Sequence, residues 1–363
     1  MTNKKGKILM AMSGGIDSTV SAMLLLEQGY ELVGVTFRTY DSIKESCLAK
    51  EKGCCSIDSI MEAKRMAEKL GFEHHILDLR QTFKEHVICN FMDEYMQGRT
   101  PNPCVLCNSS IKWGKLLDMA DEFGCSHIAT GHYAQIVHDN GHWFLANAVD
   151  AHKDQTYFLW MLTEENLSRT LFPLGGFTKQ EVRQMAFERG FEKLSQKTES
   201  QEICFIPDND YRHFLSEHVT DFEQKCQPGD FVNTKGELIG RHHGFPNYTV
   251  GQRKGLGVAF GTPQYVIGID ATNNRVVLGD RDDLLVKTLR ATACRFTASE
   301  LLEKNKCVLA RIRYKSPATE ATVEFDGRVA TLVFNEPVWG VTPGQSVVLY
   351  QNDRVIGGGI ISS

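Results

Sequence analysis

The chain has 363 residues, a length that predicts two or three domains, each large enough to bury its own core. Its formal net charge of −5 excludes a uniformly basic surface of the kind that coats nucleic acids. There are 11 cysteines but no secretion signal and no apolar stretch near the roughly 20 residues that cross a bilayer, so we expect reduced thiols, a cytoplasmic location and no membrane contact.

The first part of the chain alternates short apolar runs with helical patterns, which is typical of βαβ units. We expect strands at residues 8–12, 31–37, 74–79 and 127–130. Helices are expected at residues 18–28, 59–70 and 111–123, the second opened by a capping box of Ser59 and Glu62. The fold class is therefore α/β, with an N-terminal Rossmann-like domain built on a parallel sheet.

From about Asp230 the pattern changes to short β-like runs separated by glycine, asparagine and proline. Strands are expected at residues 264–269, 275–279, 308–314, 319–325, 328–334 and 346–351, with one short helix at 299–304. These runs predict a small, mostly β central domain and a C-terminal β-barrel. We place the domains at residues 1–208, 209–286 and 287–363.

The most informative motif, Ser13-Gly14-Gly15-Ile16-Asp17-Ser18-Thr19, lies between the first strand and the first helix. Backbone amides of a glycine-rich turn and of a helix start together bind phosphate. The Ser13, Ser18 and Thr19 hydroxyls would donate to phosphate oxygens, and Asp17 would hold Mg²⁺. The loop has neither the lysine of a Walker motif nor the glycine spacing of a dinucleotide fingerprint. It resembles the pyrophosphate loop of the N-type ATP pyrophosphatases, which implies an ATP site.

Cys107 lies near the end of the proline-containing stretch at residues 100–108, just ahead of the helix expected to begin at residue 111. The positive end of a helix stabilises a thiolate, so the position favours a reactive nucleophile. An alternative is half of a zinc site, because Cys104 and Cys107 have Cys-x-x-Cys spacing and Cys54 and Cys55 would supply the other half.

A second cysteine, Cys204, stands in a short apolar segment after the polar run at residues 195–201. Its alternative interpretation is a buried structural thiol. A third hypothesis joins Cys104, Cys107 and Cys204 as ligands of an iron–sulfur cluster with one open iron.

Taken in order, the motifs resemble those of the tRNA-specific 2-thiouridylase family, often called MnmA, over essentially the whole chain. They are residues 13–18, 100–108, 129–134 (Ala-Thr-Gly-His-Tyr-Ala), 153–159 (Lys-Asp-Gln-Thr-Tyr-Phe-Leu), 200–207, 248–257 and 311–314. The resemblance implies an enzyme that uses ATP to adenylate the 2-oxygen of the wobble uridine in tRNA and replaces that oxygen with sulfur. A sulfur-donor protein, either a cysteine desulfurase or a relay carrier, is implied as a partner.

The resemblance also implies roles for particular residues. Cys107 would be the nucleophile and Cys204 would carry a persulfide, with Asp17 acting at the phosphates. The implied ATP site consists of Ala11, Met12, Ser13, Gly14, Gly15, Ile16, Asp17, Ser18, Phe37 and Gly131. The implied contacts with the target base or the tRNA are Asn102, Pro103, Cys104, Lys153, Asp154, Gln155, Arg313 and Tyr314. Two positions depart from many relatives, which have methionine at Phe37 and aspartate at Cys104.

A local basic stretch also favours an RNA partner. No carboxylate lies between Glu237 and Asp270, whereas Arg241, Arg253 and Lys254 lie there among glycines. An ordinary solvated loop would look the same. Two other functions remain open: a ligase with the same loop that acts on a small molecule, and a zinc-stabilised RNA-binding module.

Overall fold

The computed structural model describes residues 5–40, 57–196, 203–206, 208–258, 261–298, 302 and 307–363. The chain divides into two compact units. The first unit comprises Met1–Val87, Cys104–Asn209 and Asp353–Val355, and the second comprises Ile88–Pro103, Asp210–Asn352 and Ile356–Ser363.

A five-stranded parallel sheet forms the centre of the first unit, with the order β3-β2-β1-β4-β7. Its strands are β1 (Lys7–Ala11), β2 (Glu31–Arg38), β3 (His74–Asp78), β4 (His127–Ala129) and β7 (Thr170–Leu171). Ile8, Leu9 and Met10 of the central strand are completely buried. Successive side chains of a strand point to opposite faces, so both faces of this sheet are covered.

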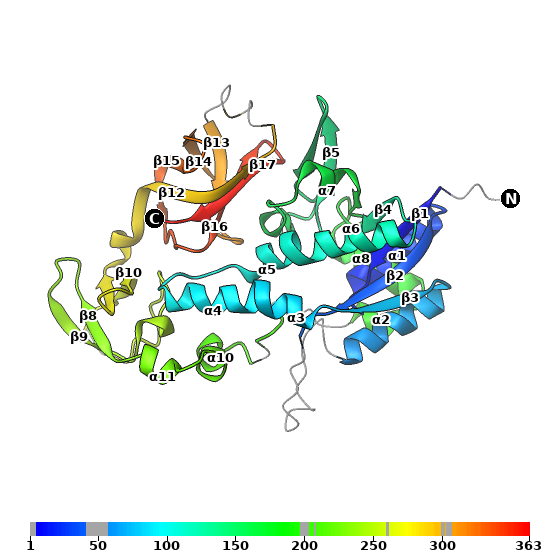
Figure 1. The fold of residues 1–363 in the computed structure, drawn as a ribbon. Helices are drawn as coiled ribbons and strands as arrows, with labels where there is room; N and C mark the ends of the chain where they lie inside the picture. The colour runs from blue at the N-terminus through cyan, green and yellow to red at the C-terminus, as the bar shows by residue number, and fades with distance from the viewer. Residues whose placement is uncertain are drawn as a thin grey trace. The chain divides into compact units, whose positions relative to one another are not determined.

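The four longest helices of the first unit pack around this sheet (Figure 1). They are α1 (Ile16–Glu27), α2 (Ile57–Leu70), α6 (Trp113–Glu122) and α8 (Lys179–Glu188). α1 and α2 share a core with alternate residues of β1, whereas α6 contacts β1 and β4. Because α2 already includes Ile57 and Asp58, Ser59 lies inside the helix and the predicted capping box at its start is wrong.

The other elements of the first unit are short. They are α3 (Arg80–Phe83), η1 (Lys84–Ile88), α5 (Pro103–Leu106), η2 (Cys107–Lys112), β5 (Gln135–Asp139), β6 (His142–Ala146), η3 (Thr156–Phe158), α7 (Glu164–Ser168) and α9 (Glu192–Ser195). α5, η2 and α6 follow one another without a break. The helix predicted to begin at residue 111 therefore begins at Pro103, because proline fits the first turn of a helix, where an amide needs no partner.

The second unit contains a small mixed sheet with three short helices. The sheet has the order β10-β11-β8-β9 and the helices are α4 (Cys89–Met96), α10 (Tyr211–His218) and α11 (Phe222–Lys225). Its strands are β8 (Gly229–Val232), β9 (Leu238–His242), β10 (Tyr265–Asp270) and β11 (Arg275–Gly279), with η4 (Phe245–Asn247) after β9. Phe231, Val266, Val276 and Leu278 form the completely buried part of its core.

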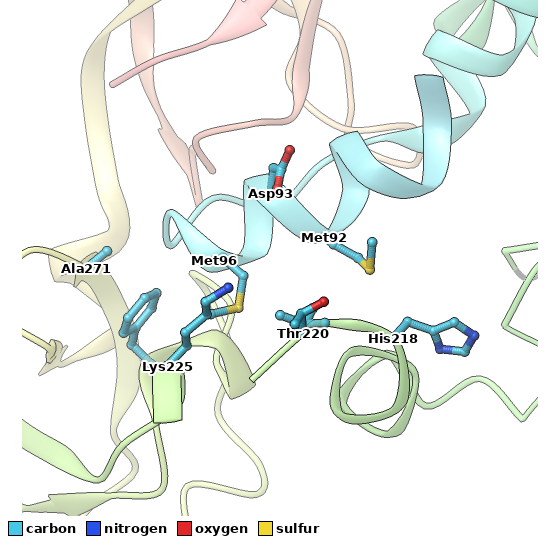
Figure 2. Close-up of a pocket in the computed structure, with 9 residues that line it drawn as sticks. Met92, Asp93, Met96, His218, Thr220, Lys225 and Ala271 are labelled. Atoms are coloured by element: carbon cyan, nitrogen blue, oxygen red, sulfur yellow. The ribbon is translucent and has the colours of Figure 1, made fainter. Parts of the chain in front are cut away.

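A cavity of about 530 Å³ lies beside α4 in this unit. In Figure 2, Met92 and Met96 extend from α4 toward the segment that carries Thr220 and Lys225. The full lining is Met92, Asp93, Met96, His218, Val219, Thr220, Lys225, Phe245 and Ala271. The lining mixes apolar side chains with charges of both signs.

Six strands form a closed barrel in the same unit, with the order β12-β15-β14-β13-β16-β17 and β12 pairing with β17. They are β12 (Leu285–Phe296), β13 (Cys307–Arg311), β14 (Thr319–Phe325), β15 (Ala330–Trp339), β16 (Ser346–Gln351) and β17 (Arg354–Ile361), and η5 (Arg281–Leu284) precedes them. The predicted fold class is thus confirmed. Of the short helix expected at residues 299–304, all but Leu302 lies outside the described residues. Among the helices that are described, none is long and apolar enough to span a bilayer.

Candidate active site

The glycine-rich loop connects β1 to α1, as predicted. Gly14 has φ +68°, and a Cβ there would lie 2.3 Å from a backbone oxygen of α2, so glycine is required. The Ser18 hydroxyl accepts from the Ser13 amide at 3.2 Å and donates to the Gly15 carbonyl at 3.1 Å. Thr19 is completely buried and donates to the same carbonyl at 2.9 Å. Thr19 therefore supports the loop from within, contrary to its expected role as a phosphate donor.

A partly buried ion pair lies at the first turn of α1. Lys179 Nζ is 2.6 Å and 2.8 Å from the two carboxylate oxygens of Asp17, and the Tyr133 hydroxyl donates to Asp17 Oδ1 at 2.9 Å. The Lys179 side chain is 10% exposed and that of Asp17 is 31% exposed. A lysine cation therefore lies at the loop although the loop motif contains none.

Sequence reasoning missed Lys179. It is the first residue of α8, whose N-cap Thr178 forms a capping box with Glu181. Carboxylates are favoured in the first turn of a helix and cations are disfavoured, because the amino end of the helix dipole is positive. A lysine at such a position, next to a recognisable capping box, is the signal that would have identified it.

Residues at the carboxyl ends of three neighbouring strands surround the loop. Ala11 ends β1 and Met12 follows it, Phe37 lies near the end of β2, and Gly131 follows β4. A Cβ on Gly131 would lie 2.8 Å from the Ser18 amide nitrogen, so this glycine permits close contact with the start of α1. The structure thus brings the ten predicted ATP-site residues to one edge of the sheet.

His132 follows Gly131 and lies against Trp113, with 5.6 Å between the ring centroids. Its Nδ1 is 2.8 Å from the Thr130 hydroxyl. Burial, with a smaller effect of the Lys112 ammonium, lowers the pKa of His132 to about 3. The imidazole is therefore neutral near pH 7.

Cys107 is buried and is the first residue of the π-helical segment η2. π-helical turns inside helices are frequent at functional sites. Cys107 lies in the second turn of the helix that begins at Pro103, not ahead of a helix as predicted, so the N-terminal position now falls to Cys104. Loss of hydration raises the pKa of the Cys104 thiol, and Lys112 partly opposes this effect; because the side chain is exposed, the desolvation is incomplete.

Cys204 is half-buried, and among the described residues neither Cys204 nor Cys107 is joined in a disulfide. The next residue, Phe205, is buried and packs edge-on against Phe83, with 5.7 Å between the ring centroids. Within the described ranges no three His, Cys, Asp or Glu side chains gather as metal ligands would. Cys54 and Cys55, proposed above as the second half of a zinc site, lie outside those ranges.

The Lys153-Asp154-Gln155 segment is built into the first unit. Asp154 is 3% exposed and accepts from the Ala148 amide at 2.8 Å and from Thr156. Gln155 Oε1 accepts from the Tyr133 amide at 2.9 Å. Lys153 and Gln155 are half-buried, so they reach solvent whereas Asp154 does not.

The remaining predicted tRNA residues belong to the second unit. Asn102 and Pro103 lie at the start of α5, and the neighbouring Thr100 and Pro101 carbonyls accept from Gln345 at 2.9 Å and 3.1 Å. Arg313 and Tyr314 lie in the turn after β13 and are half-buried.

The carboxylate-free stretch is partly structural. Phe245 and Tyr248 belong to the core of the small sheet, and His242 is 1% exposed with a bond from Nε2 to the Asn274 carbonyl. Arg253 and Lys254 are exposed. The residues of this stretch that reach solvent therefore include cations, whereas its aromatic residues lie inside.

Three family models match consecutive parts of the chain. The tRNA methyl transferase HUP domain matches residues 6–208, its PRC-barrel domain matches residues 212–280, and the aminomethyltransferase β-barrel domain matches residues 286–361. Together with the nucleotide-type loop, these matches define a tRNA-modifying enzyme with an N-terminal nucleotide domain.

Full-length relatives identify the family. Proteins named tRNA-specific 2-thiouridylase MnmA are 50% identical in Amoebophilus asiaticus, 47% in Cytophaga hutchinsonii and 44% in Salinibacter ruber. Each match covers 99% of this chain and 95–98% of the relative. The chain belongs to the tRNA-specific 2-thiouridylase family, as the motifs predicted, and it is an ATP-dependent tRNA sulfurtransferase.

Proposed function

We propose that this chain carries out tRNA 2-thiolation in two stages, adenylation at the Asp17–Lys179 loop and sulfur transfer by Cys204 and Cys107. The observation that carries the proposal is the buried cation at a glycine-rich loop in a chain of this family. The first stage joins AMP to the uridine 2-oxygen and releases pyrophosphate. It takes place in the cytoplasm, where free thiols stay reduced.

The adenylation site needs positive charge, because the bond that breaks leaves negative charge on pyrophosphate. The Lys179 ammonium and the amides of residues 14–18 supply it without rearrangement of the solvent. Asp17 also fits a magnesium ion, since one carboxylate together with nucleotide phosphates is the usual ligand set. Bound magnesium would neutralise phosphate charge, and Asp17 would hold it in place of Lys179.

Sulfur transfer uses two thiols with different surroundings. A persulfide on half-buried Cys204, loaded by a sulfur-donor protein, attacks C2 of the adenylated uridine with its terminal sulfur, and AMP leaves. The buried Cys107 thiolate then attacks Cys204 Sγ, so the old sulfur–sulfur bond breaks and the terminal sulfur stays on the uridine. The product is a Cys107–Cys204 disulfide, which an external thiol reduces.

The iron–sulfur alternative uses the same thiols. Cys104, Cys107 and Cys204 have suitable donor chemistry, but the described residues do not gather as a three-ligand set. The proposed sulfur transfer therefore involves no cluster, and iron analysis of the anaerobically purified protein tests this.

The tRNA contacts fall into two groups. We propose that Lys153, Gln155, Arg313 and Tyr314 touch the RNA directly, because each reaches solvent. Asp154 instead shapes its segment from inside. Asn102, Pro103 and Cys104 would meet the target base, and Arg253 with Lys254 would meet backbone phosphates. We also propose that the domain boundaries fall after residues 208 and 286.

The test measures loading and transfer separately. The protein is incubated with tRNA, ATP and a cysteine desulfurase system; tRNA is analysed by mass spectrometry and persulfide by peptide mapping. Cys107→Ser should carry sulfur on Cys204 but make no thiolated tRNA, and Cys204→Ser should do neither. Product formed by Cys204→Ser would overturn the assigned roles. If both variants fail and also lose iron, the cluster mechanism replaces this one.

A further inference from the structure

Trp339, the last residue of β15, lies between two parts of the second unit that are far apart in sequence. One part is the turn that carries Arg313, and the other is the loop at residues 249–254, defined here as the GQRK loop. Neither composition nor the motifs singled out this tryptophan. Its contacts connect the two parts.

On one side, Arg313 stacks on the indole. The guanidinium carbon is 4.9 Å from the Trp339 ring centre, and Nη2 donates to the Trp339 carbonyl at 3.0 Å. Gly340 has φ +71°, and a Cβ there would lie 3.5 Å from Arg313 Nη2. The Arg313 amide also donates to the Ser316 hydroxyl at 3.2 Å. A guanidinium held over an aromatic ring keeps its planar fork of donors in one orientation.

On the other side, the GQRK loop contacts the same ring. Gly251 has φ +88°, and a Cβ there would lie 3.4 Å from Trp339 Cη2. The Gly251 amide donates to the Val266 carbonyl at 2.8 Å. Tyr265 meets the indole edge-on, with 6.4 Å between the ring centroids. The backbone of Gly251 therefore lies beside the ring, and its positive φ is what favours glycine at this position.

The GQRK loop is closed by one side chain. Gln252 Oε1 accepts from the Thr249 amide at 3.1 Å, and Gln252 Nε2 donates to the Lys254 carbonyl at 2.9 Å. The exposed Arg253 and Lys254 side chains thus project from a loop with a defined shape. That loop is anchored through Gly251 at Trp339.

An indole at this position is energetically unfavourable if packing is its only role. Its Nε1 is buried and has no hydrogen-bond partner among the described atoms, which is unfavourable for a polar group. Phenylalanine would avoid this cost. Tryptophan offers the larger ring and the strongest attraction for a cation.

We propose that Trp339 is a positioning residue for tRNA, which holds Arg313 and the GQRK loop as one rigid cationic surface. The inference rests on the proposed tRNA contacts. Cations fixed at a set separation bind an RNA backbone better than mobile ones, because less side-chain freedom is lost on binding.

The experiment compares tRNA affinity across variants of the full chain at several salt concentrations. Trp339→Leu should weaken binding about 2-fold to 30-fold, from a cation–π energy of about 0.5–2 kcal/mol, and Trp339→Phe should retain most of the affinity. Arg313→Lys keeps the charge but loses the planar fork, so it should reproduce most of the Trp339→Leu defect. For Trp339→Leu, the rate of AMP release at saturating tRNA should stay at the wild-type value, because Trp339 itself is not among the proposed RNA contacts.

Two comparisons decide the outcome. In an Arg313→Gln background, Trp339→Leu should have a smaller effect than in the wild type, because the part that acts through Arg313 is gone and only the part that acts through the GQRK loop is left. Fully additive effects of the two substitutions would overturn the inference. So would wild-type affinity of Trp339→Leu if Arg313→Gln and the double variant Arg253→Gln, Lys254→Gln both bind weakly. Either result would leave the proposed tRNA contacts intact. If none of these variants weakens binding, the proposed tRNA contacts themselves fail. If Trp339→Leu does not fold, Arg313→Lys alone decides, and unchanged affinity there overturns the inference.

Discussion

Replacing Lys179 by methionine tests both the stability and the chemistry of the ion pair at the loop. Methionine keeps most of the side-chain volume and removes the charge. Asp17 would then keep only the Tyr133 hydroxyl as a partner among the contacts described above. The change therefore leaves a carboxylate without its counter-charge in a partly buried place.

The size of the effect follows from exposure. Removing one partner of a fully buried pair costs about 3–5 kcal/mol, and since the Asp17 side chain is 31% exposed we expect about 2–3 kcal/mol. For a unit of this size, the melting temperature should fall by about 4–12 °C. AMP release should fall about 100-fold to 1,000-fold, as for other electrostatic stabilisers in active sites.

Calorimetry and AMP release from labelled ATP measure the two effects. The control is Lys115→Met, which removes an exposed pair with Asp118 and should change stability by less than about 1 kcal/mol. Adding Asp17→Asn to Lys179→Met should restore most of the lost stability, because no charge is left unpaired, but should not restore AMP release. AMP release at the wild-type rate in Lys179→Met would refute the assignment of Lys179 to the phosphates.

Two further predictions concern the same unit. Gly131→Ala should reduce ATP affinity at least 10-fold, because its Cβ would lie 2.8 Å from the Ser18 amide nitrogen. In the control Gly114→Ala, in α6, the Cβ meets nothing within 4 Å, so this change should stabilise the helix by about 0.5–1 kcal/mol. Equal ATP affinity in the two variants, measured by calorimetric titration, would contradict this prediction. Burial lowers the pKa of His74 to about 4, below its unfolded value near 6.5. The neutral imidazole therefore contributes at most about 3 kcal/mol to the free energy of unfolding; this contribution is complete above pH 6.5 and is lost as the pH falls toward 4. The free energy of unfolding, measured with urea at several pH values in this range, should depend less steeply on pH in His74→Leu than in the wild type. An unchanged pH dependence would show that His74 does not titrate as described.

Local patterns were sufficient to predict the parallel sheet, the loop and many of the later strands. They failed for strands and side-chain pairs that depend on contacts between residues far apart in the sequence. β17 has three consecutive glycines, and β12 carries charged residues at Lys287, Arg290 and Arg295, so neither shows the alternation of a half-buried strand. Both strands are nevertheless held by their pairing with each other, which closes the barrel. The pairing of Lys179 with Asp17 was missed for the same reason, because the two residues lie 162 positions apart in the sequence.

The position of Asp154 shows why a motif alone does not separate contact from support. It belongs to a segment that the family resemblance assigns to tRNA, yet its oxygens are occupied inside the first unit. Its neighbour Gln155 accepts from the Tyr133 amide, and the Tyr133 hydroxyl in turn donates to Asp17. The segment that the resemblance assigns to tRNA and the glycine-rich loop are therefore connected through the hydrogen bonds of Tyr133. Loss of thiolation in an Asp154 or Gln155 variant consequently has two explanations, a lost RNA contact or a displaced Asp17. Only tRNA affinity measured separately from AMP release distinguishes them.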